Sequence, residues 1–182
     1  MTPTRIVLAL LIMTPQAVSE AIEQPPAAVA THQAPVAEII VTGDDAERQR
    51  VANATAVFAT LGMPLPDLEI RFWDDTANCD GREGLFRPSS LPWIIEICSE
   101  RAYVVPHELG HAWERATLTD SDRQTYMETR GFEVWHDPSI DPSLQAIENL
   151  AVIIQQIISH GGPTGRPNID IPFDLVTKLT AN

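Results

Sequence analysis

The segment His107-Glu108-Leu109-Gly110-His111 constrains this chain more than any other part of its sequence. On a helix, residues four apart lie on the same face, with their Cβ atoms roughly 5–6 Å apart. The imidazoles of His107 and His111 therefore converge, as two ligands of one zinc ion do. The residues after His111 favour a helix, and Pro106 fits only its first turn. We predict that the helix begins near Val105 or bends just before the histidines.

Glu108 follows the first histidine directly, so its side chain is rotated by one residue from the shared face. From there its carboxylate reaches the open side of a metal ion and acts as general base on a water whose pKa zinc lowers to about 7. The alternative is a surface helix that carries two histidines without a metal. A strand predicted over residues 93–98, just before the helix, favours the catalytic interpretation.

A catalytic zinc ion normally has three protein ligands, so two histidines are not sufficient. The metzincin extension of the motif is excluded, because Glu114 stands at its glycine position and Thr117 at its last histidine position. We prefer Glu148 as the third ligand. It lies in a strongly apolar helix predicted over residues 142–159, where an unpaired carboxylate would be costly to bury and a metal ion would compensate its charge.

Glu148 has a competing interpretation, in which it belongs to a solvent-facing polar stripe on the same helix. Val152 lies in the middle of that stripe and argues against this alternative. The other members of the stripe are Gln145, Asn149, Gln155, Gln156 and Ser159.

Several other polar residues are secondary candidates for the site. Glu114 lies two turns beyond His107, which suits a role in orienting an imidazole or fixing a neighbouring loop. His136 and Tyr126 are candidates to donate a hydrogen bond to the oxyanion of a transition state. Three further carboxylates stay open as third ligands: Asp120, Glu133 and Asp141.

The charge and the N-terminal segment indicate where the protein acts. A formal charge of −13 with a single lysine, Lys178, argues against binding to nucleic acid or to an anionic membrane. Residues 1–21 are typical of a secretory signal peptide, with a short positive region, a brief apolar run and small residues for cleavage. The Pro/Ala-rich residues 22–37 predict a linker before a domain over 38–182. We expect a secreted or periplasmic protein with no stable membrane insertion after signal cleavage.

The chain has two cysteines, Cys79 and Cys98. In an exported protein, an even pair predicts a disulfide, which here closes a loop of about twenty residues and stabilises the fold by roughly 3 kcal/mol. Neither cysteine stands in a C-x-x-C spacing, so metal binding by their thiolates is the weaker alternative.

Hydrophobic periodicity predicts the other elements. Residues 74–90 are expected to form a hairpin and loop, and Trp135 is expected to pack in the core. The expected strands cover 38–42, 68–73 and 93–98, and the expected further helices cover 46–61, 120–129, 142–159 and 173–179.

The HExxH helix, the intervening helix with its Trp-bearing loop and the later helix with residues 146–151 resemble the small gluzincin-type zinc metallopeptidases, or minigluzincins, and their secreted relatives. The resemblance covers roughly residues 68–158. It implies a single α+β zincin-like domain, with a small mixed or antiparallel sheet packed against helices. It also implies that His107, His111 and Glu148 hold one Zn²⁺ ion while Glu108 activates a water.

In zincin folds an edge strand beside the metal often pairs with an extended substrate, and residues 84–87 or 93–98 are the candidates for that strand. The sequence therefore predicts a monomeric, exported zinc metallopeptidase with a peptide or protein substrate. Two alternatives stay open: a non-catalytic metal-binding or scaffold domain, and a metal-dependent amidase that acts on cell-wall peptides. Glu108 discriminates against the first, because a purely structural site does not need a base.

Overall fold

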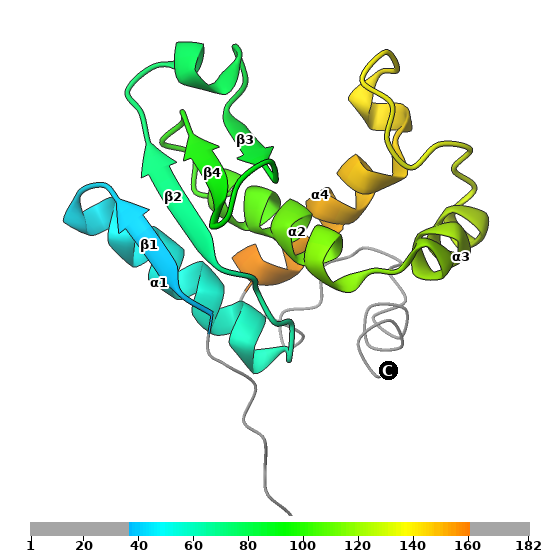
Figure 1. Cartoon of the computed structure of the whole chain (residues 1–182), viewed down its shortest axis with the longest axis horizontal. Helices are drawn as coiled ribbons and strands as arrows, with labels where there is room; N and C mark the ends of the chain where they lie inside the picture. Colours follow the sequence, from blue (N-terminus) through cyan, green and yellow to red (C-terminus); the bar gives the residue numbers. More distant parts are fainter. Residues whose placement is uncertain (1–36, 161–182) are drawn as a thin grey trace, which may run out of the picture. The chain divides into compact units, whose positions relative to one another are not determined.

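A mixed four-stranded sheet and four α-helices make up residues 37–160, the part of the chain that the computed structural model describes (Figure 1). The predicted α+β class with a small mixed sheet is thereby confirmed. The predicted signal peptide, nearly all of the linker and the tail helix over 173–179 lie outside the described residues. Within 37–160, every helix is too short or too polar to span a bilayer.

The sheet has the strand order β1-β2-β4-β3. Its first three members in that order are parallel, and β3 is antiparallel to β4. β3 is therefore an edge strand, whereas β4 is paired on both sides. The candidate edge strand over 84–87 is confirmed as an edge, and the one over 93–98 is wrong. The strands are β1 (Ile39–Thr42), β2 (Leu68–Phe72), β3 (Gly84–Arg87) and β4 (Trp93–Ile97).

Two of the predicted helices begin at capping residues that the sequence carries. Asp44 caps α1 in a capping box with Glu47, and Thr119 caps α3 in the same way with Asp122. Gly131 ends α3 with φ 74°. The helices are α1 (Asp45–Thr60), α2 (Val104–Thr117), α3 (Asp120–Arg130) and α4 (Ala146–Ser159).

α2 carries the HExxH motif and begins at Val104, so Pro106 is its third residue. A backbone N–H at that position has no partner within a helix, and the proline ring therefore removes no helical hydrogen bond. Of the two predicted possibilities, the helix begins before the histidines rather than bending there.

The predicted helix over 142–159 is wrong at its beginning. Residues 142–144 form a 3₁₀ turn, η2 (Pro142–Leu144), and Gln145 is extended before α4 begins. The physical reason is a backbone bridge: Gln145 pairs with Val134, and the N–H of Ala146 donates to the Val134 carbonyl at 3.0 Å. Leu144, expected on the apolar face, is consequently 62% exposed.

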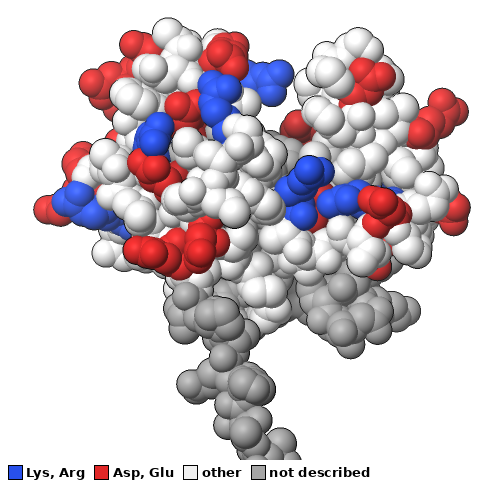
Figure 2. Space-filling view, in the orientation of Figure 1, with Lys and Arg blue, Asp and Glu red and all other residues white. Residues whose placement is uncertain are grey.

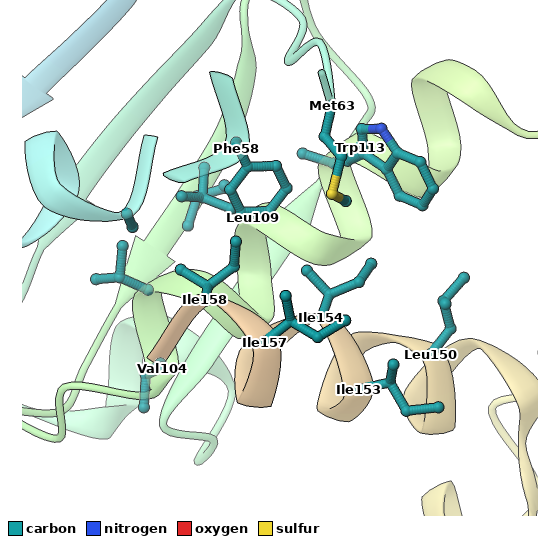
Figure 3. Close-up of a cluster of buried hydrophobic side chains, with 14 of the residues drawn as sticks. Phe58, Met63, Val104, Leu109, Trp113, Leu150, Ile153, Ile154, Ile157 and Ile158 are labelled. Carbon is teal, nitrogen blue, oxygen red and sulfur yellow. The ribbon is translucent and has the colours of Figure 1, made fainter. Parts of the chain in front are cut away.

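One face of the sheet forms the core. Ile70 of β2 and Ile95 of β4 lie opposite each other in register and are fully buried. Because side chains alternate along a strand, Glu69 and Arg71 point to the other face, where they form an ion pair at 2.8 Å. Side chains of α1, α2 and α4 meet in the same core (Figure 3).

The disulfide predicted from the two cysteines is present. Cys79 lies at the end of η1 (Thr76–Cys79), and Cys98 directly follows β4. The bond fixes the segment that leads into β3 against the segment that leads into α2. It therefore stabilises the relative placement of the edge strand and the HExxH helix.

α2 and α4 cross in close contact at Gly110. A Cβ atom built on Gly110 would lie 3.4 Å from the Cα of Ala151 and 3.5 Å from Ile154. Only a residue with little or no side chain allows this approach. Ala151 follows Glu148 by three residues, so the crossing brings the Glu148 turn of α4 next to the histidine turn of α2.

Substitutions at Gly110 test this crossing. The contacts of an added Cβ are ordinary van der Waals distances, so Gly110→Ala should leave the free energy of unfolding unchanged or raise it by up to about 1 kcal/mol through helix propensity. Gly110→Leu should lower it by about 1–3 kcal/mol, because the larger side chain forces α4 away. Urea unfolding followed by circular dichroism measures both. Equal stability of the two variants would contradict a tight crossing.

Candidate metal centre

The structure brings together the three side chains predicted as metal ligands. His107 and His111 extend from α2, and Glu148 extends from the first turn of α4. The two Nε2 atoms lie 3.2 Å apart. The Oε2 atom of Glu148 lies 3.3 Å from Nε2 of His107 and 3.7 Å from Nε2 of His111. Within residues 37–160 these three are the one group whose ligand atoms gather closely enough to hold a metal ion.

The three distances fit a single tetrahedral ion. Two ligand atoms at about 2.0–2.1 Å from zinc, at tetrahedral angles, lie about 3.3–3.4 Å apart. The donor set also fits, because two imidazoles and one carboxylate are the ligands of many catalytic zinc sites. Two imidazole nitrogens that face each other need a proton or a cation between them, since each otherwise presents a lone pair. The residues at this site therefore fit a zinc ion.

The charges at the three side chains favour a carboxylate facing imidazoles. Burial alone would raise the pKa of Glu148, but the contacts with His107 and His111 hold that pKa well below its usual range. Burial alone would lower the pKa of His111, and its contact with Glu148 reverses this effect and raises the pKa. Glu148 is consequently an anion throughout the neutral range, which is the form that binds a metal ion.

Glu108 lies beside this cluster and packs against the edge strand. It is only 6% exposed, and its Oε1 atom would lie 2.6 Å from a Cβ built on Gly84 of β3. Because glycine has no side chain, Gly84 leaves room for the Glu108 carboxyl. Burial raises the pKa of Glu108, and its neighbours His111, His107 and Arg82 oppose this rise. A raised pKa suits a group that accepts and returns a proton.

A cleft of about 670 Å³ opens over the cluster. Residues of β3, α2, η2 and α4 line it. In Figure 2 the surface is notched between the part that carries β3 and the part that carries η2. The edge strand therefore forms one wall of the cleft, and the three candidate ligands and Glu108 lie along it.

Glu114 also lines the cleft, but it contacts α3 rather than an imidazole. It is 3% exposed, and its carboxylate accepts from Arg123 Nε at 3.4 Å. Burial raises the pKa of Glu114, and the neighbouring Arg123 opposes the rise. The Nδ1 atom of His111 has no hydrogen-bond partner among the described residues. Of its two predicted roles, Glu114 is thus placed for the second, fixing a neighbouring segment.

His136 lies at the cleft and is held by Gln145. Nδ1 of His136 lies 3.0 Å from Oε1 of Gln145, which also accepts from the backbone N–H of Asp137 at 3.1 Å. The Gln145 amide nitrogen donates to the Ile140 carbonyl at 2.8 Å, so its oxygen is the acceptor. His136 therefore carries its proton on Nδ1. The competing interpretation placed Gln145 on a solvent-facing stripe, but Gln145 is 4% exposed and therefore buried.

The structure does not bring Tyr126 to the cleft. Its ring packs in the core against Trp135, and its hydroxyl donates to Asn149 at 2.8 Å. Burial raises the pKa of Tyr126 to about 12. Its predicted role as an oxyanion donor is therefore wrong, whereas Trp135 packs against the core as predicted.

The alternative third ligands also lie apart from the two histidines. Asp120 pairs with Arg123 at 3.1 Å, and Asp141 accepts from the Ser143 backbone at 2.8 Å. Glu133 is exposed. None of the three joins the cluster of ligand atoms formed within residues 37–160.

Sequence reasoning missed three residues at the cleft. Arg115 follows His111 by four residues, so the same helical spacing that paired the histidines places it on their face. Arg82 and Gly84 carry no comparable signal, because only the antiparallel pairing of β3 with β4 brings this segment to α2.

Comparison with known proteins gave no match: no family model, curated protein or solved structure is significantly similar to this chain.

A double-mutant cycle tests the contact between β3 and Glu108. Gly84→Ala should lower the free energy of unfolding by about 1–3 kcal/mol, because the new methyl group overlaps Glu108 and Val104. In a Glu108→Ala background the loss should be smaller, since part of the overlap disappears. Chemical denaturation of the wild type, both single variants and the double variant measures the coupling. Additive losses would show that Gly84 and Glu108 do not touch.

Proposed function

We propose that this protein is a zinc-dependent metallopeptidase with a zincin-like, gluzincin-type site. The observation that carries the proposal is the triangle of Nε2, Nε2 and Oε2 atoms from His107, His111 and Glu148, with sides of 3.2, 3.3 and 3.7 Å. A second acid, Glu108, lies beside this triangle at the wall of a cleft. Three ligands and one base are the parts that hydrolysis of a peptide bond requires.

When bound, the zinc ion would supply Lewis-acid chemistry, lowering the pKa of a bound water to about 7 and polarising a carbonyl. His107, His111 and Glu148 would hold the ion. Glu108 would take a proton from the attacking water and deliver it to the nitrogen of the leaving amine. Its burial supports this role, because a carboxyl with a raised pKa gives up a proton less readily to solvent and returns it to the substrate.

The edge strand β3 supports an extended peptide as substrate. An edge strand presents backbone N–H and C=O groups that another chain can pair with, and such pairing is a common mode of peptide recognition. β3 forms a wall of the cleft next to Glu108. A peptide added to this edge would run past the three candidate ligands.

His136 is the candidate for contact with the reacting carbonyl. Its Nδ1 proton is committed to Gln145, so Nε2 is the nitrogen left for the cleft. In the protonated form Nε2 would donate to a developing oxyanion. Glu114 would act only indirectly, by fixing α3 through Arg123.

The proposal includes an exported, monomeric protein that acts on peptides or proteins and inserts in no membrane. The disulfide supports export, because such bonds persist in oxidising compartments. A metal-dependent amidase of cell-wall peptides would use the same residues and differ only in substrate. A non-catalytic metal-binding domain is the other alternative, and the buried Glu108 argues against it, since burying an acid without a task destabilises the fold.

Replacing Glu108 tests the proposal. Glu108→Gln preserves the shape of the side chain but cannot accept a proton, so kcat for a peptide should fall by at least about 10²–10⁴-fold. Zinc content should stay at one ion per chain, because Glu108 is not a proposed ligand. Peptide cleavage read by mass spectrometry and metal analysis of the same samples provide both measurements.

Two variants serve as comparisons. Glu128→Gln makes the same chemical change at an exposed position on α3 and should alter neither activity nor zinc content. Glu148→Gln should lower zinc content as well as activity. Hydrolysis that survives Glu108→Gln would refute the mechanism, and a zinc-loaded protein that cleaves no peptide would favour the non-catalytic alternative.

A further inference from the structure

Two arginines at the cleft lack a carboxylate partner within residues 37–160. Nine arginines lie within residues 37–160, and six of them pair with an aspartate or glutamate: Arg48, Arg50, Arg71, Arg87, Arg101 and Arg123. In that part of the chain, Arg82, Arg115 and Arg130 form no such pair. Arg82 and Arg115 both line the cleft and are exposed.

These two arginines flank the candidate ligands from opposite sides. Arg115 lies one turn beyond His111 on the same face of α2, about 6 Å along the helix axis. Arg82 precedes Gly84 by two residues, and Gly84 contacts Val104 and Glu108 in the first half of α2. Arg82 therefore belongs to the part of the cleft next to β3, and Arg115 to the part where α2 ends.

Three of the four acidic residues that line the cleft are already engaged, and the fourth is the buried Glu108. Glu83 pairs with Arg101 at 2.7 Å and accepts from the Tyr103 hydroxyl. Glu114 pairs with Arg123, and Glu148 faces the two histidines. The charges left to recognise a ligand at the two ends of the cleft are thus positive, although the whole chain carries −13.

We propose that the cleft selects peptides with a carboxylate on each side of the bond that is cleaved, one bound by Arg82 and the other by Arg115. This inference rests on the proposed peptidase function and adds its substrate class. A guanidinium can donate two parallel hydrogen bonds to a carboxylate, so the pair fixes the orientation of the ligand as well as attracting it.

The net charge of the protein does not oppose this selection. At physiological ionic strength, charges on a surface are screened beyond about 8 Å, so the contact at each arginine outweighs distant acids. Acidic and basic groups also alternate over the face in Figure 2, without one large area of a single sign.

The carboxylate can come from an acidic side chain or from the C-terminus of the peptide, and the test separates these sources. Fluorescent peptides that carry Glu on both sides of the central bond are compared with peptides that carry Gln on one side or on both. Each is made with a free and with an amidated C-terminus. Binding is measured by anisotropy to the full-length, zinc-loaded Glu108→Gln protein, so that affinity is read without cleavage.

Each change of Glu to Gln should weaken binding by about three- to tenfold. In an Arg115→Gln background the preference should vanish on one side only, and in an Arg82→Gln background on the other side only. Arg130→Gln removes an arginine that also lacks a carboxylate partner in the described part of the chain but does not line the cleft, so both preferences should persist. If amidation of the C-terminus weakens binding and one of the Glu-to-Gln changes does not, the C-terminal carboxylate is the group that is bound on that side.

The inference is overturned by equal affinity for the Glu and Gln peptides, by a preference that survives both arginine substitutions, or by a lack of binding to every peptide. The proposed function is contradicted by a different result, namely that the wild-type protein cleaves none of these peptides. Because binding and cleavage are measured on separate proteins, the two failures are distinguishable.

Discussion

The contact between α2 and α4 is the constraint on which the site depends. Gly110 and Ala151 allow the two helix backbones to approach until a Cβ at Gly110 would lie 3.4 Å from the opposite Cα. This approach, with the apolar side chains of α4 on one side of it, holds Glu148 within 3.3 Å of His107. Helix packing therefore contributes to the position of this carboxylate, and such preorganisation suits the proposed metal site.

The second constraint is the edge strand. β3 returns antiparallel to β4 and lies against α2, where Gly84 gives Glu108 its position. The disulfide from Cys79 to Cys98 fixes the segments on either side of this strand pair. The proposed ligands and the proposed base are thus supported by different parts of the fold: α4 positions Glu148, and β3 packs against Glu108. This division explains why a small domain can present both groups to one cleft.

Much of this arrangement follows from local sequence. Capping residues such as Asp44 and Thr119, the stop at Gly131 and the motif on α2 are read from neighbours a few residues apart, and their elements were predicted closely. The sequence predicts Glu148 beside the two histidines, because a carboxylate in an apolar helix is costly to bury without a partner. Positions set by contacts between distant segments were missed or predicted wrongly. The bridge to Val134 buries Gln145, and packing against Trp135 keeps Tyr126 in the core. The pairing of β3 with β4 brings Arg82 to the cleft. Such contacts join segments whose separation leaves no periodic signal.

The most direct test of the central claim is X-ray absorption at the zinc edge of the purified protein loaded with one equivalent of zinc. The account predicts ligands of nitrogen and oxygen at about 2.0–2.1 Å, with the outer-shell scattering of two imidazoles. In Glu148→Ala one oxygen ligand should be replaced by solvent or the zinc lost, while the exposed Glu128→Ala leaves the spectrum unchanged. A spectrum that contains sulfur ligands or fewer than two imidazoles, or that is identical in Glu148→Ala, would contradict the account.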